Sequence, residues 1–196
     1  MNRRSEFSRS TGETDISLVL DLDGPIDGTR ITGIGFFDHM LDLVERHAGI
    51  GLSVAATGDL ETGSHHTVED VGICFGKALD EALGERLGIN RYGYSVIPMD
   101  EARAACAIDL SGRPYCGVDV PLPNGVTGGF EHDLLEEFMR AVASSAKLTL
   151  HLELQRDGGP HHVMEACFKA FARALRVAVA VDPESTAVPS TKGTLT

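Results

Sequence analysis

The segments HHTVE (residues 65–69) and HHVME (residues 161–165) each begin an apolar run with helical spacing. In both segments the first His and the Glu are four residues apart, so their side chains share one face of a helix. The second His lies about 100° further round the helix and must point elsewhere. Each segment can therefore supply ligands in two directions, and the two together predict a paired metal site.

The same order of expected elements surrounds both segments. The first half contains strands at 16–22, 29–32 and 50–54 and helices at 38–47 and 65–87; the second contains strands at 104–112 and 148–152, a helix at 134–145 and the second His-His helix. Superposing His65 on His161 keeps the apolar phase, since Phe75 then matches Phe171 and Leu79 matches Leu175. We interpret the chain as an internal duplication of a ββαβα unit, in an α/β (α+β two-layer) fold.

The duplication sets the expected domain organisation. One domain spans residues 7–196, with repeats at about 13–93 and 94–185 and a C-terminal loop at 186–196. Residues 1–12 are polar and are expected to be frayed.

Composition limits the classes of function. A chain of 196 residues that is 42% hydrophobic can bury a core, and its net charge of −12 argues against nucleic acid or an acidic membrane as partner. No apolar run reaches transmembrane length, and the first residues lack the apolar stretch of a signal peptide. The four cysteines form no CxxC pair, which fits a reducing compartment. We therefore expect a cytoplasmic protein.

Further metal donors are expected on the two shorter helices. His39 begins the first of them, and aligning residues 50, 52 and 54 with 148, 150 and 152 places Glu137 opposite His39, rather than His132. Imidazole and carboxylate ligands without thiolate suit Mn²⁺, Fe²⁺ or Zn²⁺. The alternative of two capped helix starts with solvated histidines explains neither the doubling nor the match of Glu69 to Glu165. For Glu137, the alternative is one of several acids on a solvated helix face.

Several strings resemble one enzyme family. They are FFDHML (36–41), HHTVEDVGI (65–73), RYG (91–93), PMDEA (98–102), DLSGRPY (109–115), TLHLEL (149–154), HHVMEACFKAFARALR (161–176) and PSTKGTL (189–195). Together they resemble imidazoleglycerol-phosphate dehydratase of histidine biosynthesis, over nearly the whole chain from about residue 7. The resemblance implies a duplicated fold like domain 2 of ribosomal protein S5. It also implies a homo-oligomer of 24 subunits and two Mn²⁺ ions per active site at subunit interfaces.

The resemblance implies roles for individual residues. The metal ligands fall on His39, His65, His66, Glu69, His161, His162 and Glu165, and the catalytic carboxylates on Glu13, Glu69 and Glu165. Contacts to a phosphorylated imidazole substrate fall on Glu13, His39, His47, His65, Arg91, Arg113, His161, Lys169, Ser190, Thr191 and Lys192. The chain departs from the family twice: Glu137 stands at the position of the remaining His ligand, and Leu43 where members commonly place a phosphate-contacting Gln.

The expected reaction is a dehydration of imidazole glycerol phosphate to imidazole acetol phosphate. If the substrate ring binds as imidazolate between two metals, it can expel the hydroxyl of the neighbouring carbon. A base must then take a proton from the adjacent carbon, and the resemblance makes Glu13 that base. Without the resemblance, these residues have simpler interpretations. Glu13 would be a solvated acid and Arg113 a residue of a surface loop. Lys169 would be an i,i+4 partner of Glu165, and residues 190–192 an ordinary C-terminal tail.

Two other classes of function fit the His-Glu segments. One is a dinuclear metallohydrolase with a metal-bound water and no imidazole-sized slot between the ions. The other is a metal-binding assembly protein in which the His-Glu pairs join subunits without chemistry. Formation of a ketone product from imidazole glycerol phosphate distinguishes the dehydratase from both.

Overall fold

The computed structural model describes residues 3–185 and 187–195 as a mixed α/β fold with two four-stranded sheets. The first half contains β1 (Arg4–Ser10), β2 (Thr14–Asp21), β3 (Arg30–Ile31), α1 (Gly35–Ala48), β4 (Gly51–Gly58), the 3-10 helix η1 (Leu60–Thr62) and α2 (His65–Leu83). The second contains β5 (Tyr92–Met99), β6 (Ala102–Asp109), β7 (Tyr115–Asp119), β8 (Val126–Thr127), β9 (Phe130–Glu131), α3 (Leu134–Ser145), β10 (Thr149–Arg156) and α4 (Pro160–Val179). Of the predicted C-terminal loop 186–196, Thr186 and Thr196 lie outside the described residues.

The two four-stranded sheets have the same strand order and directions. The first runs β1-β2-β4-β3 and the second β5-β6-β10-β7; in each, the fourth strand is parallel to its neighbour and the other pairs are antiparallel. The residues after α1 and α3 also correspond, since Gly49 and Lys147 both adopt a left-handed backbone with φ of 68° and 53°. The internal duplication is therefore confirmed.

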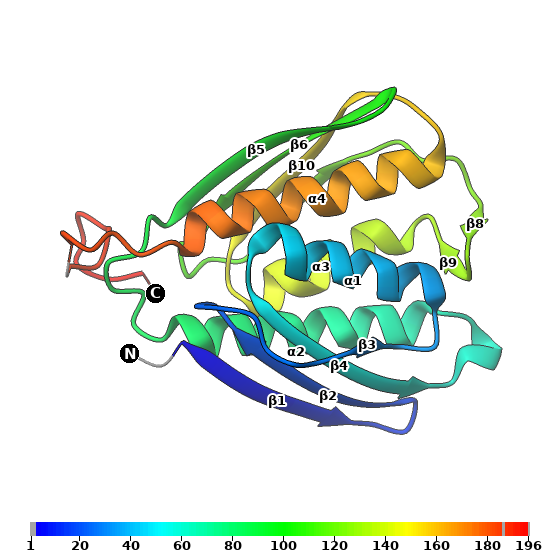
Figure 1. Cartoon of the computed structure of the whole chain (residues 1–196), viewed down its shortest axis with the longest axis horizontal. Coiled ribbons are helices and arrows are strands. Elements are labelled where there is room, and N and C mark those ends of the chain that lie inside the picture. The colour runs from blue at the N-terminus through cyan, green and yellow to red at the C-terminus, as the bar shows by residue number, and fades with distance from the viewer. Residues whose placement is uncertain (1–2, 186, 196) are drawn as a thin grey trace.

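The helices lie between the two sheets. Figure 1 shows β1, β2 and β4 on one outer side, β5, β6 and β10 on the other, and all four helices in the middle. Each half is a sheet with its own helices, and the halves meet helix to helix: α1 packs against α4 and α2 against α3. Each helix pair therefore contains one helix from each repeat.

Small residues allow α2 and α3 to approach closely. A Cβ atom added to Gly72 would lie 2.8 Å from Cβ of Ala141, and one added to Gly76 would lie 2.6 Å from Cβ of Ser145. Carbon atoms in ordinary contact are about 3.5–4.0 Å apart. Larger residues at these two positions would push the helices apart.

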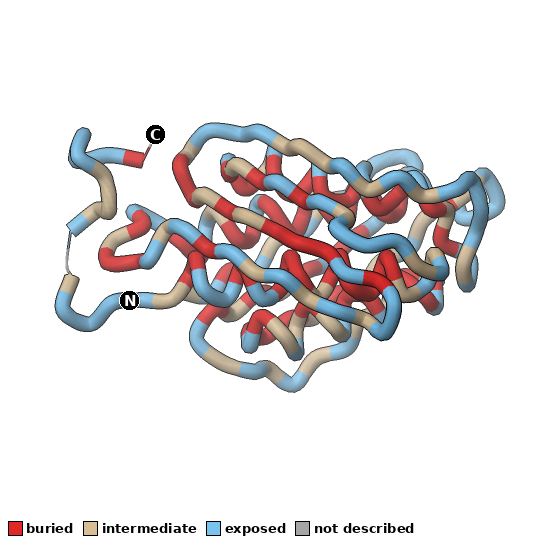
Figure 2. The backbone as a smooth tube through the Cα atoms, turned by 90° about the horizontal axis from the view of Figure 1, so that it is seen from above, coloured by how far each residue is buried: buried red, intermediate tan, exposed pale blue. Residues whose placement is uncertain are grey.

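Aromatic side chains fill the space where the helices meet. The ring of Phe37 lies 5.6 Å from that of Phe130 and 5.4 Å from that of Phe138, which in turn lies 5.4 Å from Phe168. All four are fully buried, and Figure 2 shows buried positions concentrated in the middle of the molecule and exposed ones mostly at its periphery. Among the described residues, no helix is both long and apolar enough to cross a membrane.

The expectation that residues 1–12 are frayed is wrong for β1. This strand pairs with β2 from Arg4 opposite Asp21 to Ser10 opposite Asp15. Its inward-facing polar groups are satisfied by α2, because Ser5 Oγ donates to Glu81 Oε2 (2.6 Å) and Arg9 Nε donates to Asp70 Oδ1 (2.9 Å). The inner face of β1 carries polar side chains because carboxylates distant in sequence accept their hydrogen bonds. The strand therefore shows no regular apolar alternation.

The helix limits differ from expectation by a few residues. The helix expected at 38–47 spans Gly35–Ala48, and the one expected at 65–87 ends at Leu83, just before Gly84. The helix expected at 134–145 has those limits.

Arg86 connects the two halves from a buried position. Its guanidinium donates to the carbonyl oxygens of Leu110 (3.0 Å) and Ala146 (3.1 Å) and to Asp80 Oδ1 (2.6 Å). The side chain is 5% exposed, whereas Lys147, which also donates to Asp80 (2.7 Å), is 53% exposed. Removing Arg86 leaves buried carbonyls and a half-buried carboxylate without their main donor.

We predict that Arg86→Ala lowers the free energy of unfolding of the metal-free protein by about 3 kcal/mol, because breaking a buried ion pair exposes its full desolvation cost. Lys147→Ala is the matched control and should cost less than about 1 kcal/mol, since its ion pair is solvated. Urea unfolding followed by circular dichroism measures both. Equal losses for the two variants would contradict the assignment of Arg86 as the buried connector.

Candidate metal and substrate site

Both His pairs lie in the first turn of a long helix at the same end of the molecule (Figure 1). His65 Nε2 lies 3.8 Å from Glu69 Oε2, and His161 Nε2 lies 3.0 Å from Glu165 Oε1. Within each pair the rings are perpendicular, with interplanar angles of 89° and 90°. The first His of each pair therefore faces its Glu, and the second faces another direction.

A first cluster forms where α1 meets α4. His39 Nε2 and His161 Nε2 lie 3.5 Å and 3.0 Å from the same oxygen, Glu165 Oε1, while Lys169 donates to the other oxygen. Burial raises the pKa of Glu165, but the hydrogen bonds from Lys169 and His161 outweigh it and leave that pKa below its ordinary value. The carboxylate is therefore ionised at neutral pH, with one oxygen directed at two imidazoles.

A second cluster occupies the equivalent place between α2 and α3. His65 and Glu137 line one shallow hollow of about 170 Å³, and Glu69 and Glu137 line the next, of about 260 Å³. Glu137 precedes Lys147 by ten residues, as His39 precedes Gly49, so the two stand at the same register position. Glu137 Oε2 lies 3.7 Å from Arg140, and its side chain is 25% exposed. Glu137 therefore stands at the register position of His39 and lines one hollow with His65 and another with Glu69.

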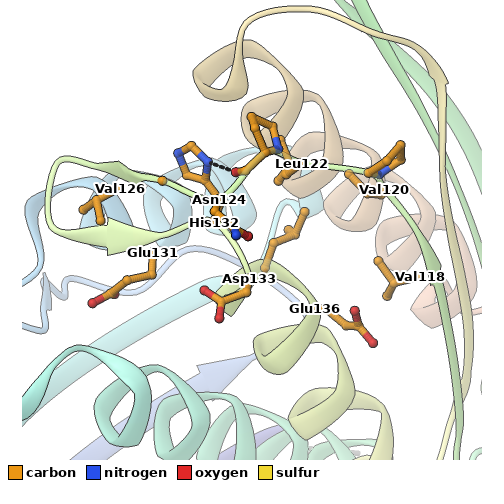
Figure 3. A pocket seen from close by; sticks show the side chains of 13 residues that line it. Val118, Val120, Leu122, Asn124, Val126, Glu131, His132, Asp133 and Glu136 are labelled. Atoms are coloured by element: carbon orange, nitrogen blue, oxygen red, sulfur yellow. Dashed lines mark hydrogen bonds between the residues drawn. The ribbon is translucent and has the colours of Figure 1, made fainter.

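His132 lies outside this second cluster. Its Nδ1 lies 2.8 Å from the carbonyl oxygen of Pro123 and its Nε2 lies 3.0 Å from Thr127 Oγ1. The residue is 7% exposed, at the edge of a cavity of about 460 Å³ lined by the loop 118–126 and the start of α3 (Figure 3). Because both ring nitrogens already have partners, this geometry favours Glu137 over His132 as a donor.

The second His of each pair contacts a carboxylate on a loop. His66 Nδ1 lies 3.1 Å from both carboxylate oxygens of Asp59, and His162 Nδ1 lies 2.9 Å and 3.1 Å from those of Glu101. These bonds raise the pKa of both histidines. The pKa of Glu101 is lowered to about 2, mainly by the hydrogen bond from the backbone N–H of Gly159 and next by the hydrogen bond from His162.

Asp59 and Glu101 are contact residues that were not predicted from the sequence. Glu101 has a signal in the duplication, because it precedes Asp109 by eight residues as Glu13 precedes Asp21. Glu13 lies in the β1–β2 turn, 3.8 Å from His66 Nε2, with its side chain 57% exposed. Asp59 follows directly on β4, and no spacing rule connects it to His66.

The cationic residues divide between the two ends of α4. Lys169 contacts Glu165 in the first cluster, whereas Arg91 donates to Asp109 (2.7 Å and 3.1 Å) and to the carbonyl oxygen of Pro189 (2.9 Å). The tail residues Ser190, Thr191 and Lys192 follow Pro189. Arg113, 63% exposed, lies 4.0 Å from Asp109. Arg91, Arg113 and the tail therefore gather at one place.

That place is far from the clusters within one chain. The backbone N–H of Arg91 donates to the carbonyl oxygen of Ala178, which is 17 residues after His161 in α4. Such a helical span measures roughly 26 Å. One chain therefore keeps its expected phosphate contacts and its expected metal ligands apart, with Lys169 the exception.

Two other expected residues flank the first cluster on α1. Burial, followed by the charges of Lys169 and Arg173, lowers the pKa of His47, so its ring is neutral at pH 7. Leu43 is partly buried against the apolar core. As an apolar residue it offers no hydrogen bond to a phosphate.

The donor set fits a divalent metal. His39 and His161 lie 3.5 Å and 3.0 Å from Glu165 Oε1, but the three donors do not all lie within 4.8 Å of one another, so an ion bound there would have to draw the two rings together. Imidazole nitrogen and carboxylate oxygen, with no thiolate nearby, are ligands that Mn²⁺, Fe²⁺ and Zn²⁺ accept. His39, His161 and Glu165 could hold one ion, and Glu137, His65 and Glu69 a second.

Comparison with known proteins identifies the family. A family model described as imidazoleglycerol-phosphate dehydratase matches residues 32–175. The chain belongs to the imidazoleglycerol-phosphate dehydratase family. It is therefore a hydro-lyase, and its family carries out a dehydration step of histidine biosynthesis.

Relatives and solved structures of imidazoleglycerol-phosphate dehydratase match along nearly the whole chain. The dehydratase of Jannaschia sp. (strain CCS1) is 50% identical over 98% of this chain and 100% of its own. That of Acetivibrio thermocellus is 51% identical over 100% of both chains. The crystal structure of the Staphylococcus aureus N315 enzyme has a TM-score of 0.82 at 38% identity, covering 91% of this chain and 99% of its own. The Pyrococcus furiosus enzyme in complex with (S)-C348 has a TM-score of 0.84 at 36% identity, covering 96% and 100%.

Proposed function

We propose that this chain converts imidazole glycerol phosphate to imidazole acetol phosphate with two Mn²⁺ ions per active site. The observation that carries the proposal is the pair of equivalent clusters in which imidazole and carboxylate groups converge, one between α1 and α4 and one between α2 and α3. Family membership supports the substrate. When bound, the ions would supply Lewis-acid chemistry that holds the substrate imidazole ring in its anionic form.

The metal ligands divide into two kinds. His39, His161 and Glu165 would hold one ion and Glu137, His65 and Glu69 the other, so that Glu69 and Glu165 would take part in catalysis as ligands. His66 and His162 contact Asp59 and Glu101 instead of the carboxylates of these clusters. We assign them to the ions of neighbouring copies, which makes each metal centre a shared one.

The same reasoning applies to the substrate phosphate. Arg91, Arg113 and the tail residues Ser190, Thr191 and Lys192 lie about one length of α4 from the clusters of their own chain. We propose that they bind the phosphate of a substrate held at a neighbouring copy's metal centre. Guanidinium, ammonium and hydroxyl groups are suited to a phosphate. A closed assembly such as a 24-mer provides the required neighbours.

The proton transfer falls to Glu13. Expulsion of the hydroxyl from the carbon next to the ring is completed by loss of a proton from the adjacent carbon, which gives an enol and then the ketone. Glu13 is the base because its exposed carboxylate lies beside His66 and, among the described residues, forms no ion pair with a Lys or Arg. We assign contacts with the substrate to His39, His47, His65, His161 and Lys169.

We propose a cytoplasmic location. The cysteines at 74, 106, 116 and 167 are all free, and three of them are buried. Free thiols in a folded chain suit a reducing compartment.

The test of the proposed function is turnover. Purified protein loaded with Mn²⁺ and given imidazole glycerol phosphate should form an enolisable ketone, detected by its ultraviolet absorbance in alkali, and the metal-free protein should form none. Absence of product from fully loaded protein would refute the dehydratase proposal and leave a binding or assembly role.

We predict that Glu137→Ala reduces the bound Mn²⁺ from two ions per chain to one, because it removes the oxygen donor of the second cluster. His132→Ala is the matched control and should leave both ions in place, since both of its ring nitrogens bond to the 123–127 loop. Metal analysis after gel filtration measures the ratio. Loss of metal in His132→Ala, with none in Glu137→Ala, would show that the repeat register is wrong.

We predict that Glu13→Gln lowers kcat by about 10²–10⁴-fold, because positioned general bases contribute rate factors of that size. Mn²⁺ content should stay at two per chain, since Glu13 is not among the proposed ligands. Steady-state kinetics and metal analysis on one preparation separate the two effects. Normal turnover by Glu13→Gln would exclude Glu13 as the base.

A further inference from the structure

The two repeats use equivalent turn carboxylates differently. Glu13 in the β1–β2 turn and Glu101 in the β5–β6 turn stand at the same repeat position, eight residues before Asp21 and Asp109. Glu13 makes one long contact, 3.8 Å to His66 Nε2. Glu101 is bound on both oxygens.

Glu101 fixes both the start of α4 and the His162 ring. Its Oε1 accepts the backbone N–H of Gly159 at 2.8 Å, and its two oxygens lie 3.1 Å and 2.9 Å from His162 Nδ1. A Cβ atom on Gly158 would lie 2.8 Å from Glu101 Oε1, so the loop before α4 passes directly over this carboxylate. A ring that donates Nδ1–H to a carboxylate keeps its Nε2 lone pair free.

Asp59 does the same for His66 in the first repeat, from a different part of the fold. Both of its oxygens lie 3.1 Å from His66 Nδ1, and one also accepts the hydroxyl of Thr62 at 3.0 Å. Because Asp59 holds Nδ1 of His66, Glu13 is not needed there. The equivalent of Asp59 in the second repeat, Asp157, instead accepts the backbone N–H of Gly158 at 2.8 Å.

We propose that Glu101 and Asp59 are positioning residues that hold His162 and His66 as Nδ1–H tautomers, with Nε2 presented to a metal ion. The inference rests on the proposed metal-dependent function and extends it. A carboxylate behind a ligating imidazole fixes its tautomer and its orientation and raises its basicity. In the first repeat Asp59 takes the role that Glu101 has in the second, and Glu13, the repeat counterpart of Glu101, is left free for proton transfer.

A competing interpretation involves Asp100. Ligand atoms of Asp100, Glu101 and His162 lie within 4.8 Å of one another, a spacing that a bound cation could bridge. The direct Glu101–His162 hydrogen bond argues against this, because Nδ1 cannot donate to the carboxylate and ligate a metal at once. The two interpretations differ in what they require of Asp100, which makes Asp100→Asn the matched control.

The experiment is a Mn²⁺ titration of the metal-free protein, with free Mn²⁺ measured by electron paramagnetic resonance. Glu101→Gln and Asp59→Asn keep the size of each side chain and remove its charge. Each should weaken one of the two Mn²⁺ per chain by roughly 10–100-fold and leave the other ion unchanged. Asp100→Asn should bind both ions as the wild type does. Unfolding of the metal-free variants in urea reports whether the fold itself has changed.

A double-mutant cycle separates positioning of His162 from any general effect. On a His162→Ala background, Glu101→Gln should weaken Mn²⁺ binding no further, because the ring it positions is gone. A further loss on that background, or an equal loss in Asp100→Asn, would overturn the inference while leaving the proposed function intact. Wild-type affinity in Glu101→Gln would overturn it as well. Failure of the wild-type protein to bind any Mn²⁺ would instead remove the proposed function and this inference together.

Discussion

The close packing of α2 on α3 is the constraint on which the candidate site depends. Gly72 and Gly76 remove the side chains that would hold the two helices apart, and Ala141 and Ser145 present small groups opposite them. This approach brings Glu137 of one repeat beside the His-Glu turn of the other. Where α1 meets α4, the ring of Phe36 packs edge-on against that of His161 at 5.0 Å. The donor clusters are thus a consequence of how the two repeats bury their helices against each other.

Duplication explains why the donors occur twice, and its departures show where the two halves have separate roles. The two sheets have equal strand order, and the first turn of each long helix carries the same His-His-x-x-Glu spacing. At one pair of equivalent positions the first repeat has His39 and the second has Glu137, so one proposed ligand changes from an imidazole to a carboxylate. At another pair of equivalent positions, Glu13 makes only a long contact with His66, whereas Glu101 is bound by a backbone amide and an imidazole. A symmetric scaffold can therefore support an asymmetric reaction.

Much of the fold could be predicted from periodicity, because most of its elements have an apolar face that meets the core. The helix at Leu134–Ser145 has its predicted limits, and its apolar phase follows the buried face. The strand Arg4–Ser10 could not be predicted, since its inner face is polar and its partners, Asp70 and Glu81, lie over sixty residues away. Asp59 was missed for the same reason, because no spacing connects it to His66, whereas Glu101 could have been found from its repeat position opposite Glu13. The choice of Glu137 over His132 came from repeat register, and it stays a prediction.

The geometry of α4 links the proposed chemistry to assembly. Its first turn carries His161 and Glu165, the proposed metal donors. Its last turn accepts the backbone N–H of Arg91, whose guanidinium is paired with Asp109 and donates to the carbonyl oxygen of Pro189. A rigid helix of this length cannot bring its two ends to one small substrate. The two rings of each His pair have the same consequence, because His65 and His161 face Glu69 and Glu165 whereas His66 and His162 contact carboxylates on loops. On the proposed function, each active site must therefore combine the α2 and α4 starts of some copies with the Arg91 end of another.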